Sequence, residues 1–203
     1  MWGRPPAAHA PYQLPDIRLA GTRVSLRPPR LGDWHEWAML RSRNAGFLKP
    51  WEPVWDEGSL TEEYYERRLH RQVREWNGDQ CYPFLIVLND GDRIIGAINV
   101  NNVARGAAQF ASLGYWIDES CQRHGYMTEA GRLIAAHAFT GLKLHRLCAA
   151  CLPENVRSRS LLTKLGFKEE GFAPRYIQID GLWRDHVLYG LPFEDWEKRN
   201  IIA

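Results

Sequence analysis

The chain has 203 residues, of which 45% are hydrophobic and 25% are charged, and its formal net charge is +2. This length and composition are typical of one globular domain with a sizeable core. The small net charge and the lack of a Lys/Arg block argue against direct nucleic-acid binding. No apolar run approaches the roughly 20 residues that span a bilayer. We therefore expect neither a nucleic-acid nor a membrane partner.

The four cysteines do not form the framework of a secreted disulfide-rich domain, and the Pro- and Ala-rich start of the chain lacks the apolar core of a signal peptide. We expect free thiols in a cytoplasmic protein. Cys148 and Cys151 have redox spacing, but they lie in a strand-like run, where residues three apart point to opposite faces. We expect no bound metal.

Residues 1–18 are expected to form a flexible or loosely docked extension, and residues 19–203 one domain. Alternating polar and apolar residues predict a strand over 23–27, and helical patterns follow around 33–42 and 61–76.

The segment 47–55 between these helices contains Pro50 and Pro53, which predict an irregular loop. It presents Trp51 and Trp55 outside any helical pattern, whereas the tryptophans within the helical patterns are most simply core residues.

Three strands are predicted next, over 83–88, 94–103 and 110–117, and the turn 89–92 is a strong hairpin signal between the first two. Close spacing of the three indicates an antiparallel meander. The pattern then changes to helical spacing from Thr128, and Gly141 ends that helix.

A strand over 145–152, a short helix over 157–165 and two strands around Asp180-Gly181 complete the chain. The order β-α-α-β-β-β-α-β-α-β-β predicts an α/β (α+β) domain. We expect one mixed, mostly antiparallel sheet with helices on both faces.

The loop 121–128, Cys-Gln-Arg-His-Gly-Tyr-Met-Thr, leads from a strand into a helix. Unpaired N–H groups and the helix dipole make a helix start suitable for a pyrophosphate. Gly125 permits a positive φ and a close approach, and Arg123 and His124 offer positive charge for a further phosphate. An ordinary strand-to-helix turn with a glycine would look the same. Neither a P-loop nor a Rossmann motif is present.

A second segment, Asn155-Val-Arg-Ser158, follows the next strand and opens a helix. Together the two segments resemble the GNAT acetyltransferases, whose loop Gln/Arg-x-x-Gly-x-Gly/Ala grips the coenzyme pyrophosphate and whose Asn-x-x-Ser holds the pantetheine arm. Met127 stands where most members have a small residue, but its backbone N–H is unchanged. The resemblance implies acetyl-CoA as cosubstrate, bound by residues of these segments and of the preceding strand: Trp116, Ile117, Gln122, Arg123, His124, Gly125, Tyr126, Met127, Thr128, Asn155 and Ser158.

The resemblance also implies direct transfer of acetyl to an amine in a ternary complex, with a backbone N–H of strand 113–117 as the oxyanion donor. Ser158 then faces the coenzyme sulfur as a proton donor, although a serine near a helix start can simply cap it. Ile177 stands where some relatives have a glutamate base. Tyr115, Asp185 and His186 are candidates for a weaker base or water relay, and the last two can instead lock a hairpin.

The segments 48–53 and 170–188 are similar to RimJ/RimL-type acetyltransferases, the first to the RimJ subgroup, which implies a protein N-terminal α-amine, possibly of a ribosomal protein, as acceptor. Trp51 and Trp55 then line a slot for the peptide, or else pack the loop onto the sheet. Two other functions remain open: acetylation of a small amine, and a silent acyl-CoA sensor. We expect a monomer or a homodimer.

Overall fold

The structure is a computed structural model that describes the backbone of residues 13–201 and the side chains as far as Arg199. Residues 1–12 of the expected extension therefore lie outside the described residues. Within the remainder of that segment, Ile17 is partly buried against the core and Arg18 forms an ion pair with Asp92 at 2.7 Å.

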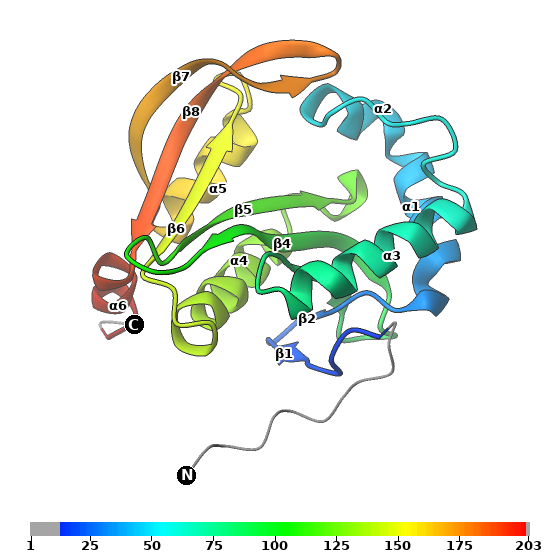
Figure 1. Ribbon diagram of the computed structural model, residues 1–203, viewed down its shortest axis with the longest axis horizontal. Coiled ribbons are helices and arrows are strands. Elements are labelled where there is room, and N and C mark those ends of the chain that lie inside the picture. Colours follow the sequence, from blue (N-terminus) through cyan, green and yellow to red (C-terminus); the bar gives the residue numbers. More distant parts are fainter. Residues whose placement is uncertain (1–12, 202–203) are drawn as a thin grey trace.

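One eight-stranded sheet runs through the molecule in the order β1-β2-β3-β4-β5-β6-β8-β7 (Figure 1). β5 and β6 are parallel, and the other neighbours are antiparallel. The strands are β1 Leu19–Ala20, β2 Val24–Arg27, β3 Tyr82–Leu88, β4 Ile94–Ala104, β5 Phe110–Ile117, β6 Arg146–Cys151, β7 Lys168–Ile179 and β8 Leu182–Pro192.

Helices cover both faces of the sheet, as predicted. The α-helices are α1 Trp34–Arg43, α2 Ala45–Leu48, α3 Glu62–Asn77, α4 Tyr126–Ala136, α5 Val156–Leu165 and α6 Phe193–Ile201. α1 and α3 bury Trp37, Leu40 and Tyr65 against one face. α4 and α5 contribute Ile134 and Leu162 to the larger core on the other face. The helices on both faces of the sheet therefore contribute residues to the site described below.

β1, α2, α6 and the short 3-10 turns were not predicted. β1 is only two residues long, and α6 packs Phe193 and Trp196 against Phe139. The expected irregular loop over 47–55 instead begins with the end of α2 and a 3-10 turn, η2 Lys49–Trp51. A proline is compatible with such a turn when it occupies its start, where its missing N–H has no helical partner, and Pro50 does so.

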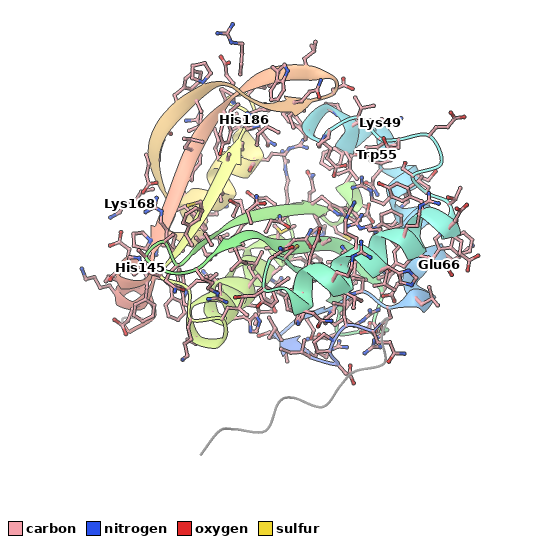
Figure 2. The ribbon with its side chains drawn as sticks, viewed as in Figure 1. Lys49, Trp55, Glu66, His145, Lys168 and His186 are labelled. Atoms are coloured by element: carbon pink, nitrogen blue, oxygen red, sulfur yellow. The ribbon has the colours of Figure 1, made fainter. Side chains whose placement is uncertain are left out.

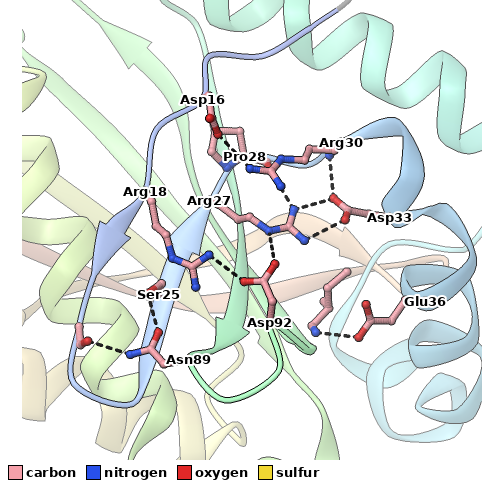
Figure 3. A network of polar contacts seen from close by, with 12 residues as sticks. Asp16, Arg18, Ser25, Arg27, Pro28, Arg30, Asp33, Glu36, Asn89 and Asp92 are labelled. Atoms are coloured by element: carbon pink, nitrogen blue, oxygen red, sulfur yellow. Dashed lines mark hydrogen bonds and ion pairs between the residues drawn. The ribbon is translucent and has the colours of Figure 1, made fainter.

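A polar network fixes the start of α1 to the edge of the sheet (Figure 3). The buried guanidinium of Arg27 donates two hydrogen bonds of 2.8 Å to Asp33, just before α1, and one of 3.3 Å to Asp92. Hydrogen bonding to Asp33 raises the pKa of Arg27 despite its burial. Glu36 accepts the N–H of Ile94 at 2.8 Å. These contacts fix the position of α1 relative to the sheet, and with it the position of the α1 residues that line the site.

β5 and β6 pair over a short distance only. Phe110, Ala111 and Ser112 lie opposite Arg146, Leu147 and Cys148, and among the described residues the ladder ends there. Beyond Ser112, β5 keeps its pairing with β4, so the edge of Gly114–Ile117 that faces β6 is left open. This divergence of two central strands creates the space in which the site lies.

Candidate active site

A cavity of about 2390 Å³ occupies the divergence between β5 and β6. The α1–α2 segment and α3 line it on one side, and the starts of α4 and α5 on the other. The β7–β8 hairpin closes part of its rim. Figure 2 labels His186 on β8 and, from the opposite side of the opening, Lys49 and Trp55.

The predicted phosphate loop lies in this cavity. Gly125 has φ +80° immediately before α4, and Arg123 has φ +62°. No acceptor within the described part of the chain receives a hydrogen bond from the N–H groups of residues 123–128. A cluster of free N–H groups at a helix start fits a pyrophosphate. The loop residues that line the cavity are Gln122, Arg123, Gly125, Tyr126, Met127 and Thr128.

His124 is the one predicted loop residue that does not line the cavity. Its ring stacks on Tyr126 at 5.6 Å, and its carbonyl accepts a hydrogen bond of 2.8 Å from Arg23. The side chain therefore supports the loop in this structure, whereas we had expected it to offer charge to a phosphate.

Arg23 and Glu129 clamp the loop to the edge of the sheet. Glu129 accepts the N–H of Arg23 at 2.7 Å and of Val24 at 3.3 Å, and its other oxygen accepts Nε of Arg23 at 3.0 Å. Although burial opposes its charge, these donors lower the pKa of Glu129. A Cβ at Gly125 would lie 3.1 Å from the guanidinium of Arg23. The positive φ favours glycine here, and a Cβ would in addition displace the end of the Arg23 side chain slightly.

Ser158 and Tyr115 meet across the gap between β5 and α5. The two hydroxyl oxygens are 2.8 Å apart. Asn155 caps α5 by accepting the backbone N–H of Ser158 at 3.0 Å, so the serine hydroxyl is not the cap. Burial raises the pKa of Tyr115, so its phenol stays protonated. Both residues line the cavity.

Trp51 and Trp55 have different environments. Trp51 lines the cavity, whereas Trp55 is absent from the lining and lies under the guanidinium of Arg41 at 4.1 Å. Glu52 accepts hydrogen bonds of 2.8 and 2.5 Å from Arg41 and one of 2.8 Å from Trp55 Nε1. Trp55 therefore packs against Arg41 of α1 and Glu52, which is closer to the packing interpretation of the sequence than to a peptide slot.

The hairpin residues also differ. His186 is buried and lines the cavity, with Nδ1 2.9 Å from the carbonyl oxygen of Arg184. Ile177 lines the cavity as well. Asp185 is exposed, does not line it, and accepts the N–H of Arg175 at 2.8 Å. This geometry favours the interpretation that Asp185 locks the hairpin.

Trp116 and Ile117 line the cavity on the open stretch of β5, and Asn155 lines it from the start of α5. Arg23, Glu129 and Arg41 were not singled out from the sequence. Glu129 and Arg23 are 106 positions apart, and no local sequence pattern predicts such a contact.

No helix among residues 13–201 is long and apolar enough to cross a membrane. Within the same residues, no group of three or more His, Cys, Asp or Glu side chains has an arrangement that could hold a metal ion.

Comparison with known proteins agrees with this geometry. The chain matches the acetyltransferase (GNAT) domain over residues 23–168. It is 37% identical to the [ribosomal protein uS5]-alanine N-acetyltransferase of Escherichia coli, over 90% of this chain and 94% of that protein. It is 34% identical to the probable N-acetyltransferase YjcK of Bacillus subtilis, over 89% of this chain and 99% of that protein.

Among solved structures, Mycobacterium smegmatis RimJ in complex with CoA-disulfide superposes with a TM-score of 0.82 at 34% identity, covering 89% of this chain and 88% of that one. The cavity, its free N–H groups and these matches agree on acetyl-CoA as the cosubstrate. The chain belongs to the GNAT family and is an acetyl-CoA-dependent N-acetyltransferase.

Proposed function

We propose that the enzyme acetylates the N-terminal α-amine of a protein by direct attack in a ternary complex. The observation that carries this proposal is the state of Glu52. Glu52 belongs to the segment 47–55, which we expect to face the acceptor, and its carboxylate lines the cavity. Both of its oxygens already accept hydrogen bonds from Arg41 or Trp55. A polyamine or aminoglycoside needs free carboxylates, whereas a peptide N-terminus brings one amine and an otherwise neutral backbone.

The name of the Escherichia coli relative, an alanine N-acetyltransferase of ribosomal protein uS5, supports the same substrate class. A ribosomal-protein acceptor would place the reaction in the cytoplasm, in line with the expectation from the sequence.

Acetyl-CoA, when bound, supplies an activated acetyl group. The N–H groups of residues 123–128 would hold its pyrophosphate, and Asn155, which lines the cavity, would contact its pantetheine arm. Ser158 would donate a proton to the leaving sulfur, with Tyr115 hydrogen-bonded to the serine. N–H groups of β5 that point away from β4 are the donors toward the acetyl carbonyl.

A strong base is not required for an α-amine. Its reference pKa is near 8, against about 10.4 for lysine, so a useful fraction is neutral at physiological pH. Ile177, on the cavity wall where some relatives have a glutamate, is consistent with such an acceptor. His186 remains a candidate for a weak relay.

The test is an acceptor screen by thiol release. Peptides with a free N-terminal Ala or Ser should be acetylated, and the same peptides with blocked N-termini and an internal lysine should not. Faster turnover of spermidine or of lysine side chains would replace this proposal with the small-amine enzyme. Binding of coenzyme A without turnover of any amine would favour the sensor.

A further inference from the structure

Four arginines from α1 and α3 line the cavity: Arg41, Arg43, Arg68 and Arg71. Three have carboxylate partners. Arg41 is paired with Glu52, Arg43 with Asp118, and Arg71 with Glu75 at 3.6 Å. Arg68 has neither an ion-pair partner nor a hydrogen-bond acceptor among residues 13–199. The wall therefore carries one unmatched positive charge.

The sequence of α3 explains why Arg68 is unmatched. Arg67 and Arg71 have glutamates four positions away, the spacing at which helical side chains meet. The residues three and four positions from Arg68 are Tyr64, Tyr65, Arg71 and Gln72. None of these is acidic, so the helix itself offers Arg68 no anion.

Packing holds the guanidinium of Arg68 in place. It lies over the ring of Trp37 at 5.2 Å, and the guanidinium of Arg41 approaches the same ring at 5.9 Å. Burial and the charge of Arg41 lower the pKa of Arg68, so the charged form is destabilised where it stands. A second, small void of about 10 Å³ beside Arg68 is at most the size of one water molecule, and no acidic residue lines it.

The position of Arg68 assigns it to the acceptor side. α3 and Trp37 cover the sheet face opposite to that of α4 and α5, where the phosphate loop and Ser158 lie. Trp116 of β5 packs on the α1–α3 side and lines the same cavity. On this side of the cavity, away from the phosphate loop, the acceptor is expected rather than the phosphates of acetyl-CoA.

We propose that Arg68 is a specificity-determining residue that binds a carboxylate side chain of the acceptor, a few residues after its N-terminus. This inference rests on the proposed N-terminal acetylation. It narrows the substrate class to proteins with an acidic residue close behind the acetylated one. A guanidinium that is held in place and lacks an anion binds a carboxylate with charge-assisted hydrogen bonds.

The test uses peptides with a free N-terminal alanine and an amidated C-terminus, so that the side chain is the added carboxylate. Glutamate is moved through the positions after the alanine, and each peptide is compared with its glutamine version. At one position the wild-type enzyme should favour Glu over Gln by about tenfold in kcat/KM. Arg68→Gln should remove that ratio.

Arg67→Gln is the matched control, because Arg67 is the neighbouring arginine, is exposed, and pairs with Glu63. It should keep the ratio. As a second measurement on the wild-type enzyme, which needs no folded variant, the ratio should shrink as ionic strength rises. Equal rates for Glu and Gln peptides at every position, or a ratio that survives Arg68→Gln, would overturn the inference. Failure of every free N-terminus to react would instead remove the proposed function and this inference with it.

Discussion

The side-chain oxygen of Asn155 accepts the backbone N–H of Ser158 at 3.0 Å, which leaves the serine hydroxyl free to meet Tyr115 at 2.8 Å. Ser158→Ala should therefore lower kcat by about 10- to 100-fold, because a general acid contributes on that scale or above. KM for acetyl-CoA and the melting temperature should change little. Steady-state kinetics and thermal unfolding measure these effects.

Asn155→Ala is the contrasting variant. Loss of a helix cap costs about 1 kcal/mol, so this change should lower the melting temperature more than Ser158→Ala does. Full activity of Ser158→Ala with a lower melting temperature would show that the hydroxyl is structural.

Arg23→Ala should raise KM for acetyl-CoA several-fold and leave kcat nearly unchanged. The side chain holds the carbonyl of His124 and the carboxylate of Glu129, so its loss frees the loop that presents the N–H groups. Arg18→Ala is the control, because Arg18 forms an exposed pair with Asp92, and such pairs contribute about 0–1 kcal/mol. An equal effect of both variants would show only a general loss of stability.

Gly125→Val should weaken acetyl-CoA binding far more than Gln122→Ala. Valine is strained at φ +80°, and its Cβ would meet Arg23 at 3.1 Å. Gln122 contributes only a side chain to a site made of backbone donors. Calorimetric titration with coenzyme A compares the two, and similar affinities would argue against the loop as the pyrophosphate site.

Trp51→Ala should raise KM for the peptide and leave that for acetyl-CoA unchanged, since Trp51 lines the cavity on the side proposed for the acceptor. Trp55→Ala should lower the melting temperature instead, because it removes the ring under Arg41 and a hydrogen bond to Glu52. The prediction fails if Trp51→Ala leaves KM for every peptide unchanged.

The pH profile of kcat/KM should rise with an apparent pKa near 8, that of the acceptor amine. It should then stay level up to about pH 10. Ser158 is the proposed donor, and its partner Tyr115 is expected to act in its protonated form. Burial raises the pKa of Tyr115 above the ordinary value near 10, so this form persists as the pH increases. A rising limb well below 8 would indicate an enzymic base, with His186 as the first residue to replace.

Most of the fold could be predicted because its elements have strong local patterns. The strand over 110–117 was predicted with its observed bounds, and the helix expected from Thr128 begins at Tyr126, directly after the left-handed Gly125. Helix α6 was missed because its stability comes from a partner distant in sequence, since Phe193 packs on Phe139. The strand β1 was missed because its two residues are too few to show an alternating pattern, although Leu19 pairs with the nearby Leu26.

The part of the site that consists of backbone N–H groups could be predicted, because a local motif marks it. The side-chain contacts between distant segments could not be predicted. Gly125 could be read from its place before a helix. The engagement of Glu52 by Arg41 and the clamp of Arg23 on Glu129 depend on how the layers pack, which no local pattern contains. The same holds for Arg68, which has no carboxylate partner among residues 13–199.

The brief ladder between β5 and β6 also affects cooperativity of unfolding. Three residue pairs join β1–β5 to β6–β8 within the described sheet, and the shared core beneath α4 must supply the remaining cohesion. Acetyl-CoA bound in the gap would contact both parts of the sheet and stabilise their association. At a hundredfold excess over Kd, such a ligand adds about 2.7 kcal/mol to the free energy of unfolding. The amide protons of β6 should then exchange with solvent more slowly in the liganded enzyme.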